Sequence, residues 1–208
     1  MKVNWPERFY CNSPVRRLFQ RKETALWHAM RPMLPGGNCL EIGCGNGAGA
    51  ALIVAVFAPA KLHCLDLDPK MIALAKRRQA RHGPRQAVFL EGDAQNLPFP
   101  DASMDAVFNF GIVHHLEDWQ RGIAEVSRVL RPGGGFYFEE IFEALYANWI
   151  LRHVVLHPTQ NRFQGPQWRQ ALAGCGLELL PGYRESRHTT VGVAVKPAAG
   201  DGQRGLCA

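Results

Sequence analysis

Three glycines stand within five positions of the stretch LEIGCGNG, which covers residues 40–47. Glycine is costly in backbone entropy, so such a cluster is typical of a turn whose backbone comes very close to a ligand. Gly43, Gly45 and Ala48 satisfy the pattern GxGxx(G/A), in which a turn and a helix start bind a nucleotide-like ligand. Asp66 follows 21 residues after Gly45 (66 − 45), at the end of the next apolar run. A carboxylate there can accept hydrogen bonds from both hydroxyls of a ribose, so the two features together indicate a ligand that carries adenosine.

Glu41 bears on which adenosine compound is bound. It lies two residues before the first glycine, and residues 40–60 contain no lysine or arginine to offset its charge. A dinucleotide would bring an anionic pyrophosphate to the helix start beside this carboxylate, which is unfavourable. An ammonium and a sulfonium group would be attracted instead, so the charge favours S-adenosylmethionine. A purely structural role, in which Glu41 caps amides of the loop, is the alternative.

Short apolar runs alternate with helical patterns along the chain, and this alternation must position the glycine turn. We expect strands over residues 39–42, 61–67, 86–91, 104–110, 135–141, 177–183 and 188–196. We expect helices over residues 14–31, 47–57, 69–82, 118–130 and 166–175. Asp68 and Pro69 provide a strong start for the third helix. Strands that alternate with helices favour right-handed crossovers and a parallel sheet covered on both faces.

Five motifs resemble, in sequence and in order, those of class I S-adenosylmethionine-dependent methyltransferases: LEIGCGNG, LDLDP (65–69), EGDAQNLPF (91–99), DAVFNFGIVHHL (105–116) and RVLRPGGGFYF (128–138). They are most similar to the type 11 subgroup, which contains the ubiquinone/menaquinone-biosynthesis methyltransferases. The resemblance implies an α/β, Rossmann-like fold with a seven-stranded, mostly parallel sheet in the order 3-2-1-4-5-7-6. Helices would cover both faces, with a small helical lid. One methyltransferase domain would span residues 1–196, followed by a flexible tail at 197–208.

By matching position, the resemblance also implies which residues would hold the cofactor. Asp66 would bind the ribose, and Leu67 would lie against the adenine. Asp93 and the amide of Ala94 would bind the edge of the adenine ring, although a turn-forming aspartate is the alternative for Asp93. Asn109 would face the methionine end. The expected cofactor contacts are Tyr10, Glu41, Gly43, Cys44, Gly45, Asp66, Leu67, Asp93, Ala94 and Asn109.

Methyl transfer from a sulfonium is an in-line displacement in which the cofactor supplies the reactive group. The protein aligns the acceptor and excludes water, and a base is needed only where the acceptor must lose a proton. His114, His115 and Glu139 are the candidates for a catalytic role, because they follow or close the fourth and fifth strands. Side chains alternate along a strand, so Glu139 and Glu140 cannot both point inward. A structural role for the two histidines is the alternative.

The insertion at residues 142–163 is the best indication of the acceptor. Tyr146, Trp149, His153 and His157 share one face if the segment is helical, and we expect them to bind the substrate. The segment would then form a lid that closes together with the N-terminal residues around Tyr10. Ordinary packing on the sheet is the alternative. A lid of this composition suits a small, partly apolar or aromatic acceptor.

The basic balance of the chain leaves other partners open. The net charge is +6, and arginine and lysine cluster at residues 15–22 and 76–85. A nucleic-acid or protein methyltransferase and a non-catalytic cofactor-binding subunit are the alternative functions. The chain shows no nucleic-acid-binding motif, so we expect no nucleic-acid partner. The helix at 14–31 combines cations with apolar residues, which suits peripheral contact with a membrane or packing across the mouth of the site.

The remaining composition favours a cytoplasmic, globular protein. Apolar residues make up 47% of the chain, and the longest apolar stretch, at 50–60, has 11 residues, about half of a membrane span. The N-terminus lacks the apolar segment of a secretory signal. The six cysteines form no CxxC pair and have no metal-ligand spacing, so we expect reduced thiols and no metal.

Overall fold

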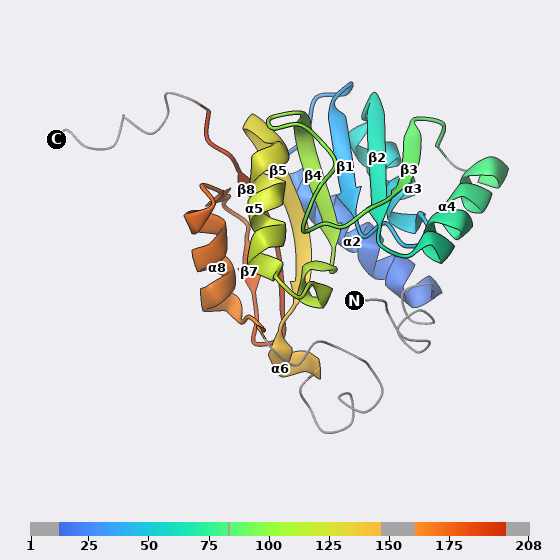
Figure 1. Ribbon diagram of the computed structural model, residues 1–208. Helices are drawn as coiled ribbons and strands as arrows, with labels where there is room; N and C mark the ends of the chain where they lie inside the picture. The colour runs from blue at the N-terminus through green and yellow to red at the C-terminus, as the bar shows by residue number, and fades with distance from the viewer. Residues whose placement is uncertain (1–12, 83, 147–160, 199–208) are drawn as a thin grey trace.

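The computed structural model describes residues 13–82, 84–146 and 161–198 (Figure 1). The helices are α2 (Pro14–Met30), α3 (Ala48–Phe57), α4 (Pro69–His82), the 3-10 turn η1 (Val113–His115), α5 (Trp119–Val129), α6 (Glu143–Tyr146) and α8 (Gly165–Gly174). The strands are β1 (Asn38–Ile42), β2 (Lys61–Asp66), β3 (Ala87–Glu91), β4 (Met104–Phe110), β5 (Leu130–Ile141), β6 (Glu178–Leu179), β7 (Arg184–Glu185) and β8 (Thr189–Val195).

One mixed sheet forms the middle layer of the fold. Its strand order is β3-β2-β1-β4-β5-β8-β6, and β7 also pairs with β8. The first five strands in this order are parallel, whereas β8 runs antiparallel to β5, β6 and β7. The predicted Rossmann-like fold and strand order are confirmed, with β8 in the place of the expected seventh strand. The order reverses between β1 and β4, and ligands of such sheets bind beyond the carboxyl ends of the strands at this point.

The expected sixth strand, 177–183, is reduced to β6, and β7 follows beyond its expected end, so the sheet has eight strands rather than the predicted seven. β5 pairs along the whole of β8, so β6 and β7 must both lie on the other edge of β8. Pro181 and Gly182 separate the two pieces; proline has no N–H to donate, and Gly182 has a φ of 97°. The two residues force a turn where one continuous strand was expected.

β5 begins earlier than the predicted residues 135–141. α5 ends at Val129, and the chain enters β5 at Leu130, so that the glycine-rich turn becomes part of the strand. Gly133 N donates to Lys196 O at 2.7 Å, and Lys196 N donates to Gly134 O at 3.0 Å. The hydrogen bonds between β5 and the chain at the end of β8 therefore begin before residue 135, where the strand was expected to start.

Polar side chains start three of the helices where the sequence predicts. Ser13 Oγ accepts a hydrogen bond from Arg16 N at 3.1 Å at the start of α2. Asp68 Oδ1 accepts from Lys70 N at 2.9 Å before α4, and Asp118 Oδ1 accepts from Arg121 N at 2.9 Å before α5. Each satisfies an amide that the first turn of a helix leaves without a partner.

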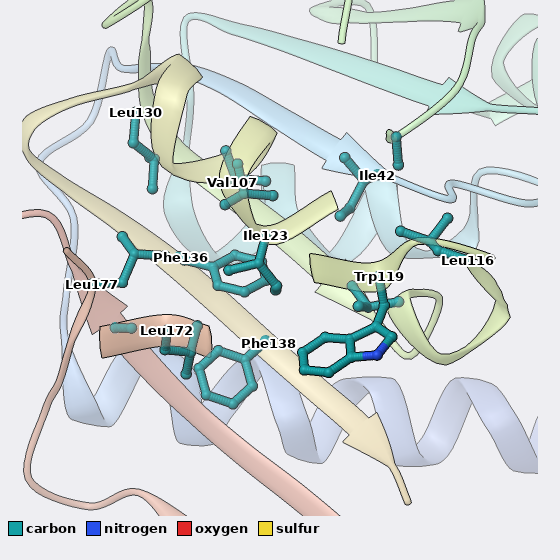
Figure 2. Packing of buried hydrophobic residues seen from close by; sticks show 14 of the residues in the cluster. Ile42, Val107, Leu116, Trp119, Ile123, Leu130, Phe136, Phe138, Leu172 and Leu177 are labelled. Atoms are coloured by element: carbon teal, nitrogen blue, oxygen red, sulfur yellow. The ribbon is translucent and has the colours of Figure 1, made fainter. Parts of the chain in front are cut away.

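Helices pack on both faces of the sheet. Figure 2 shows Trp119 and Ile123 of α5 and Leu172 of α8 around Phe136 and Phe138 of β5, all of them buried. The odd-numbered residues of β5 face the other way. This apolar cluster and a second one on the opposite face of the sheet hold the carboxyl edge of the sheet in place.

The second cluster lies under α2, α3 and α4. Trp27 of α2 and Phe57 of α3 pack on Phe108 of β4 and Tyr137 of β5. Trp27 Nε1 also donates to the carbonyl of Phe138 at 3.0 Å, which fixes α2 to the middle of the sheet. Among the described helices, none has the length and hydrophobicity that crossing a bilayer requires.

Candidate active site

The glycine loop leaves β1 at the point where the strand order reverses. Gly43, Gly45 and Gly47 have φ values of 66°, 52° and 76°, a region that side-chain-bearing residues avoid. A Cβ on Gly43 would lie 2.3 Å from Ile112 Cγ2, so no side chain fits there. The sequence therefore needs glycine for both the turn and its close approach to residue 112.

Asp66 holds the glycine loop in place from the end of β2. Its Oδ2 accepts a hydrogen bond from Gly45 N at 2.8 Å, and its Oδ1 accepts from Asp68 N at 2.9 Å. Each carboxylate oxygen can accept more than one hydrogen bond. The side chain can thus order the loop and still accept from ligand hydroxyls.

Two adjoining cavities of about 110 and 90 Å³ lie along this edge of the sheet. The first lies between the glycine loop, α2 and residues 110–112 after β4. The second lies between the end of β2 and residues 92–95 after β3. Gly43, Asp66, Ile112 and His115 line both cavities. An elongated ligand can therefore pass across Asp66 with one end in each cavity.

The second cavity has the character of a purine site. Leu65, Leu67 and Ala94 give it apolar walls, and the Asp93 carboxylate lies beside them. Asp93 Oδ1 accepts from Gln95 N at 2.8 Å, which fixes the carboxylate in a tight turn. The structural alternative for Asp93, a turn former, is thus realised, and the carboxylate still lines the cavity.

α2 brings a buried ion-pair cluster to the first cavity. Arg16 donates to Glu23 Oε1 at 2.8 Å, to Glu139 Oε2 at 2.8 Å and to the carbonyl of Phe110 at 3.0 Å. Burial raises the pKa of Glu23 to about 8, with a further contribution from the charge of Glu139, while Arg16 opposes the rise. Burial likewise raises the pKa of Glu139. Glu139 is therefore held by Arg16 behind the cavity wall, because Arg16 lines the cavity.

Gln20 lies one turn after Arg16 and lines the same cavity. Its side chain is buried, and its Oε1 has no hydrogen-bond partner among the described residues. Neither Gln20 nor Arg16 is among the site residues expected from the sequence. The signal was Trp27: counting back from this core residue by helical turns leads to Glu23, Gln20 and Arg16 on the same face.

Glu140 points to the opposite face of β5 from Glu139, as the alternation predicts. Its carboxylate accepts from Asn109 Nδ2 at 2.7 Å and from Val113 N at 2.6 Å, and it lies 2.7 Å from His114 Nδ1. Burial raises its pKa to about 7, against the effect of these hydrogen bonds. His114 is buried in this network. His115 packs on the His114 ring, with the two ring centroids 4.1 Å apart, and lines both cavities.

Comparison with known proteins agrees with this geometry. A family model described as "Methyltransferase domain" matches residues 40–138. The fatty-acid O-methyltransferase of Mycolicibacterium smegmatis is 35% identical over 162 residues, which are 77% of this chain and 52% of that protein. The chain belongs to the class I S-adenosylmethionine-dependent methyltransferases.

Other relatives show how far the likeness extends. The phthiotriol/phenolphthiotriol dimycocerosates methyltransferase of Mycobacterium tuberculosis is 40% identical over 123 residues, 58% of this chain and 44% of that protein. The chain thus spans about half the length of the curated relatives it matches. The crystal structure of the [4+2]-cyclase SpnF has a TM-score of 0.70 at 20% identity, covering 88% of this chain and 81% of that one. That likeness shows the fold alone.

Glu41 of the methyltransferase lies beneath the loop rather than in the cavity wall. It is buried, and its Oε1 would be 2.1 Å from a Cβ on Gly49. Burial raises its pKa to about 8, and a hydrogen bond from Cys64 opposes the rise. Glu41 is therefore mostly protonated at neutral pH in the ligand-free protein. Glu41 attracts a cation strongly only when binding of that cation causes Glu41 to lose its proton. The preference for a cationic ligand that the sequence indicates at Glu41 is therefore weaker than expected.

Cys44 and Asn109 are placed differently from each other. Cys44 lines the first cavity, and burial, followed by the charges of Glu41 and Asp66, raises the pKa of its thiol well above the ordinary value. Asn109 is fully buried; its Nδ2 donates to Glu140 Oε1 at 2.7 Å, and its Oδ1 accepts from Ile112 N at 2.9 Å. Asn109 thus fixes the segment after β4, and it does not line either cavity.

The expected lid falls mostly outside the described residues. Tyr146 ends α6, and Trp149, His153, His157 and Tyr10 lie in the ranges that the structure does not describe. Their assignment to substrate or cofactor stays a prediction.

Proposed function

We propose that the chain transfers a methyl group from S-adenosylmethionine to an oxygen of a small, lipid-like acceptor. The observation that carries the proposal is the position of Asp66, which holds the glycine loop and lies where the two cavities meet. The names of the relatives, which act on fatty acids and on phthiotriol lipids, support the acceptor class. Their greater length makes the acceptor a matter for experiment.

The residues that line the cavities suit the parts of the cofactor. Asp66 would accept from the ribose hydroxyls, and Asp93 would accept from the amino group of an adenine held between Leu67 and Ala94. The glycine loop lines the first cavity where the methionine part would lie, and nothing lies within 4 Å of a Cβ placed on Gly45. When bound, the cofactor supplies an electrophilic methyl group on its sulfonium.

Arg16 and Gln20 would bind the amino-acid end of the cofactor. That end carries one carboxylate and one ammonium group, and a buried site must match both. Arg16 lines the first cavity, and among the described residues that line either cavity it is the one arginine or lysine. Gln20 Oε1, buried and unsatisfied, offers an acceptor for the ammonium.

His115 is the residue best placed to take a proton from an acceptor hydroxyl. It lines both cavities, and its ring packs on His114, which Glu140 holds. Glu139 is less suited, because Arg16 engages its carboxylate. A carboxylic acid acceptor is already ionised at neutral pH and needs only positioning.

Calorimetry with S-adenosylhomocysteine tests the cofactor site. We expect Asp66→Asn to weaken binding by roughly 10- to 100-fold, the cost of losing charge-assisted hydrogen bonds. Asp101→Asn, whose carboxyl is mostly exposed and outside both cavities, should bind as the native chain does. Equal affinity of the two variants would refute the proposal.

A comparison of two ligands tests the amino-acid end. 5′-Methylthioadenosine lacks the carboxylate and the ammonium. Gln20→Leu should therefore weaken the binding of S-adenosylhomocysteine by about tenfold and leave the binding of methylthioadenosine unchanged. Arg16→Met should act in the same direction. If the variants lose affinity for both ligands equally, Gln20 and Arg16 support the fold rather than bind the ligand.

The acceptor class is tested with labelled cofactor and a panel of saturated fatty acids, long-chain alcohols and alkylphenols. Methyl esters or ethers should form with at least one class. Methylation of RNA or protein instead would favour the alternative function, and binding without any transfer would identify a non-catalytic module.

A further inference from the structure

The first turns of α2 expose an apolar face to solvent. Val15, Leu18 and Phe19 have exposed fractions of 56%, 56% and 47%. Their spacing of three and four residues places them on one side of the helix. Arg16 and Gln20 are buried on the side that faces the cavity. The first turns of the helix thus have a polar inner face and an apolar outer face, the reverse of an ordinary surface helix.

Cations surround this apolar face. Arg17, Arg21 and Lys22 are exposed, and the only acid of α2, Glu23, is buried against Arg16. Every residue of α2 is described, so its outer face carries three positive charges and no negative one.

The basic surface continues onto α4. Burial first, and the charge of Arg17 of α2 second, lower the pKa of Arg78 of α4. Lys70, Arg77 and Arg81 of α4 are exposed. Figure 1 shows the start of α2 close to the start of α4, at the edge where the carboxyl ends of β1 and β2 lie.

We propose that the outer face of α2, with Val15, Leu18 and Phe19 at its centre, docks the protein on an anionic lipid surface. Apolar side chains flanked by arginine and lysine match the acyl and headgroup layers of such a surface. A second copy of the chain fits less well, because a symmetric contact would set these cations against their own copies. Nucleic acid would leave the three apolar side chains unused.

The position of this face relates the docking to the active site. Arg16 and Gln20 line the first cavity from the other side of the same turns, so docking would bring the mouth of the site to the lipid surface. This part rests on the proposed function, since it gives a lipid-like acceptor a short path from the membrane. The docking itself requires neither cofactor nor methyl transfer.

Flotation of the full chain with vesicles tests the proposal. We expect binding to phosphatidylcholine vesicles that contain phosphatidylglycerol, little binding to phosphatidylcholine alone, and a loss of binding as salt is raised. Leu18→Glu combined with Phe19→Glu should reduce the bound fraction at least tenfold. Leu34→Glu is the matched control, because Leu34 is 87% exposed but lies beyond the other end of α2.

Other outcomes separate this proposal from the proposed function. Absence of binding to both kinds of vesicle, or equal binding by the double variant and the Leu34 control, would overturn the docking. So would a dimer in light scattering that the double variant dissociates. The double variant should still bind S-adenosylhomocysteine like the native chain. A chain that floats but does not bind S-adenosylhomocysteine would contradict the proposed function and leave the docking intact.

Discussion

Glu140 and His114 form a buried pair, with 2.7 Å between Glu140 Oε2 and His114 Nδ1. The pair joins β5 to η1, the turn that places His115 at the cavities. Because Asn109 and Val113 also donate to the carboxylate, one acid fixes the whole segment that follows β4. The position of the segment that borders the cavities thus depends on Glu140, although Glu140 itself lines neither cavity.

Glu140→Gln should therefore destabilise the protein by about 2 kcal/mol. Each carboxylate oxygen faces N–H donors, so an amide NH2 in its place would oppose a donor in either orientation. Urea unfolding measures the effect. Glu178→Gln, at an exposed position of β6, is the control, and equal stability of the two variants would contradict the role given to Glu140.

His115→Gln should lower kcat for a hydroxyl acceptor by roughly 100-fold, the usual contribution of a positioned base. The affinity for S-adenosylhomocysteine should change much less. The acidic limb of the pH–rate profile, which reports the imidazole, should disappear in the variant. His188→Gln, on the exposed surface, should behave like the native chain. An unchanged profile in His115→Gln would exclude it as the base.

Gly49→Ala should destabilise the protein by about 1–3 kcal/mol. A Cβ at this position would lie 2.1 Å from Glu41 Oε1 and 2.7 Å from Phe110 Cε2, within a buried part of α3. Gly174→Ala in α8 is the matched control, since nothing lies within 4 Å of its Cβ, and it should gain about 0.5 kcal/mol. Thermal unfolding of both variants measures the difference, and opposite signs are expected.

Glu41→Gln should flatten the pH dependence of stability. The folded chain keeps the Glu41 proton up to about pH 8, whereas the ordinary pKa of the group is 4.5. Between these values the folded state binds more protons than the unfolded state, so the free energy of unfolding falls as pH rises and levels off above 8. Removing this group should reduce the fall between pH 5 and 8.5 by about 2–4 kcal/mol. Urea unfolding at both pH values decides, and an undiminished fall would show that Glu41 is not the cause.

The sequence alone predicts the fold well, and it predicts which residues meet at the edge of the sheet where the cofactor would bind. Asp66, Asp93 and the glycine loop line the cavities as expected, because each follows a strand whose neighbour is fixed by the βαβ pattern. The break at Pro181 was not foreseen, since the whole stretch 177–183 was expected as one strand, and β7 at Arg184–Glu185 was not expected at all. Such interruptions depend on backbone donors rather than on periodicity.

The other half of the site was harder to predict, for a reason that lies in α2. Core-facing helices are recognised by their apolar stripe, yet the stripe with Val15 and Phe19 faces solvent. The helix was therefore expected to contact a membrane or to pack across the mouth of the site, without a role for Arg16 or Gln20 as individual residues. The partners of Arg16 that lie across the fold, Phe110 and Glu139, are 94 and 123 residues away in the chain, and only the fold brings them together.

Cys44 shows a last effect of burial at the glycine loop. A thiolate is among the strongest nucleophiles in proteins, and one placed beside a sulfonium would compete for its methyl group. Because the pKa of this thiol is raised well above its ordinary value, the sulfur stays protonated at neutral pH and reacts slowly. The loop is thereby protected from self-alkylation, and mass spectrometry after long incubation with the cofactor should find Cys44 unmodified.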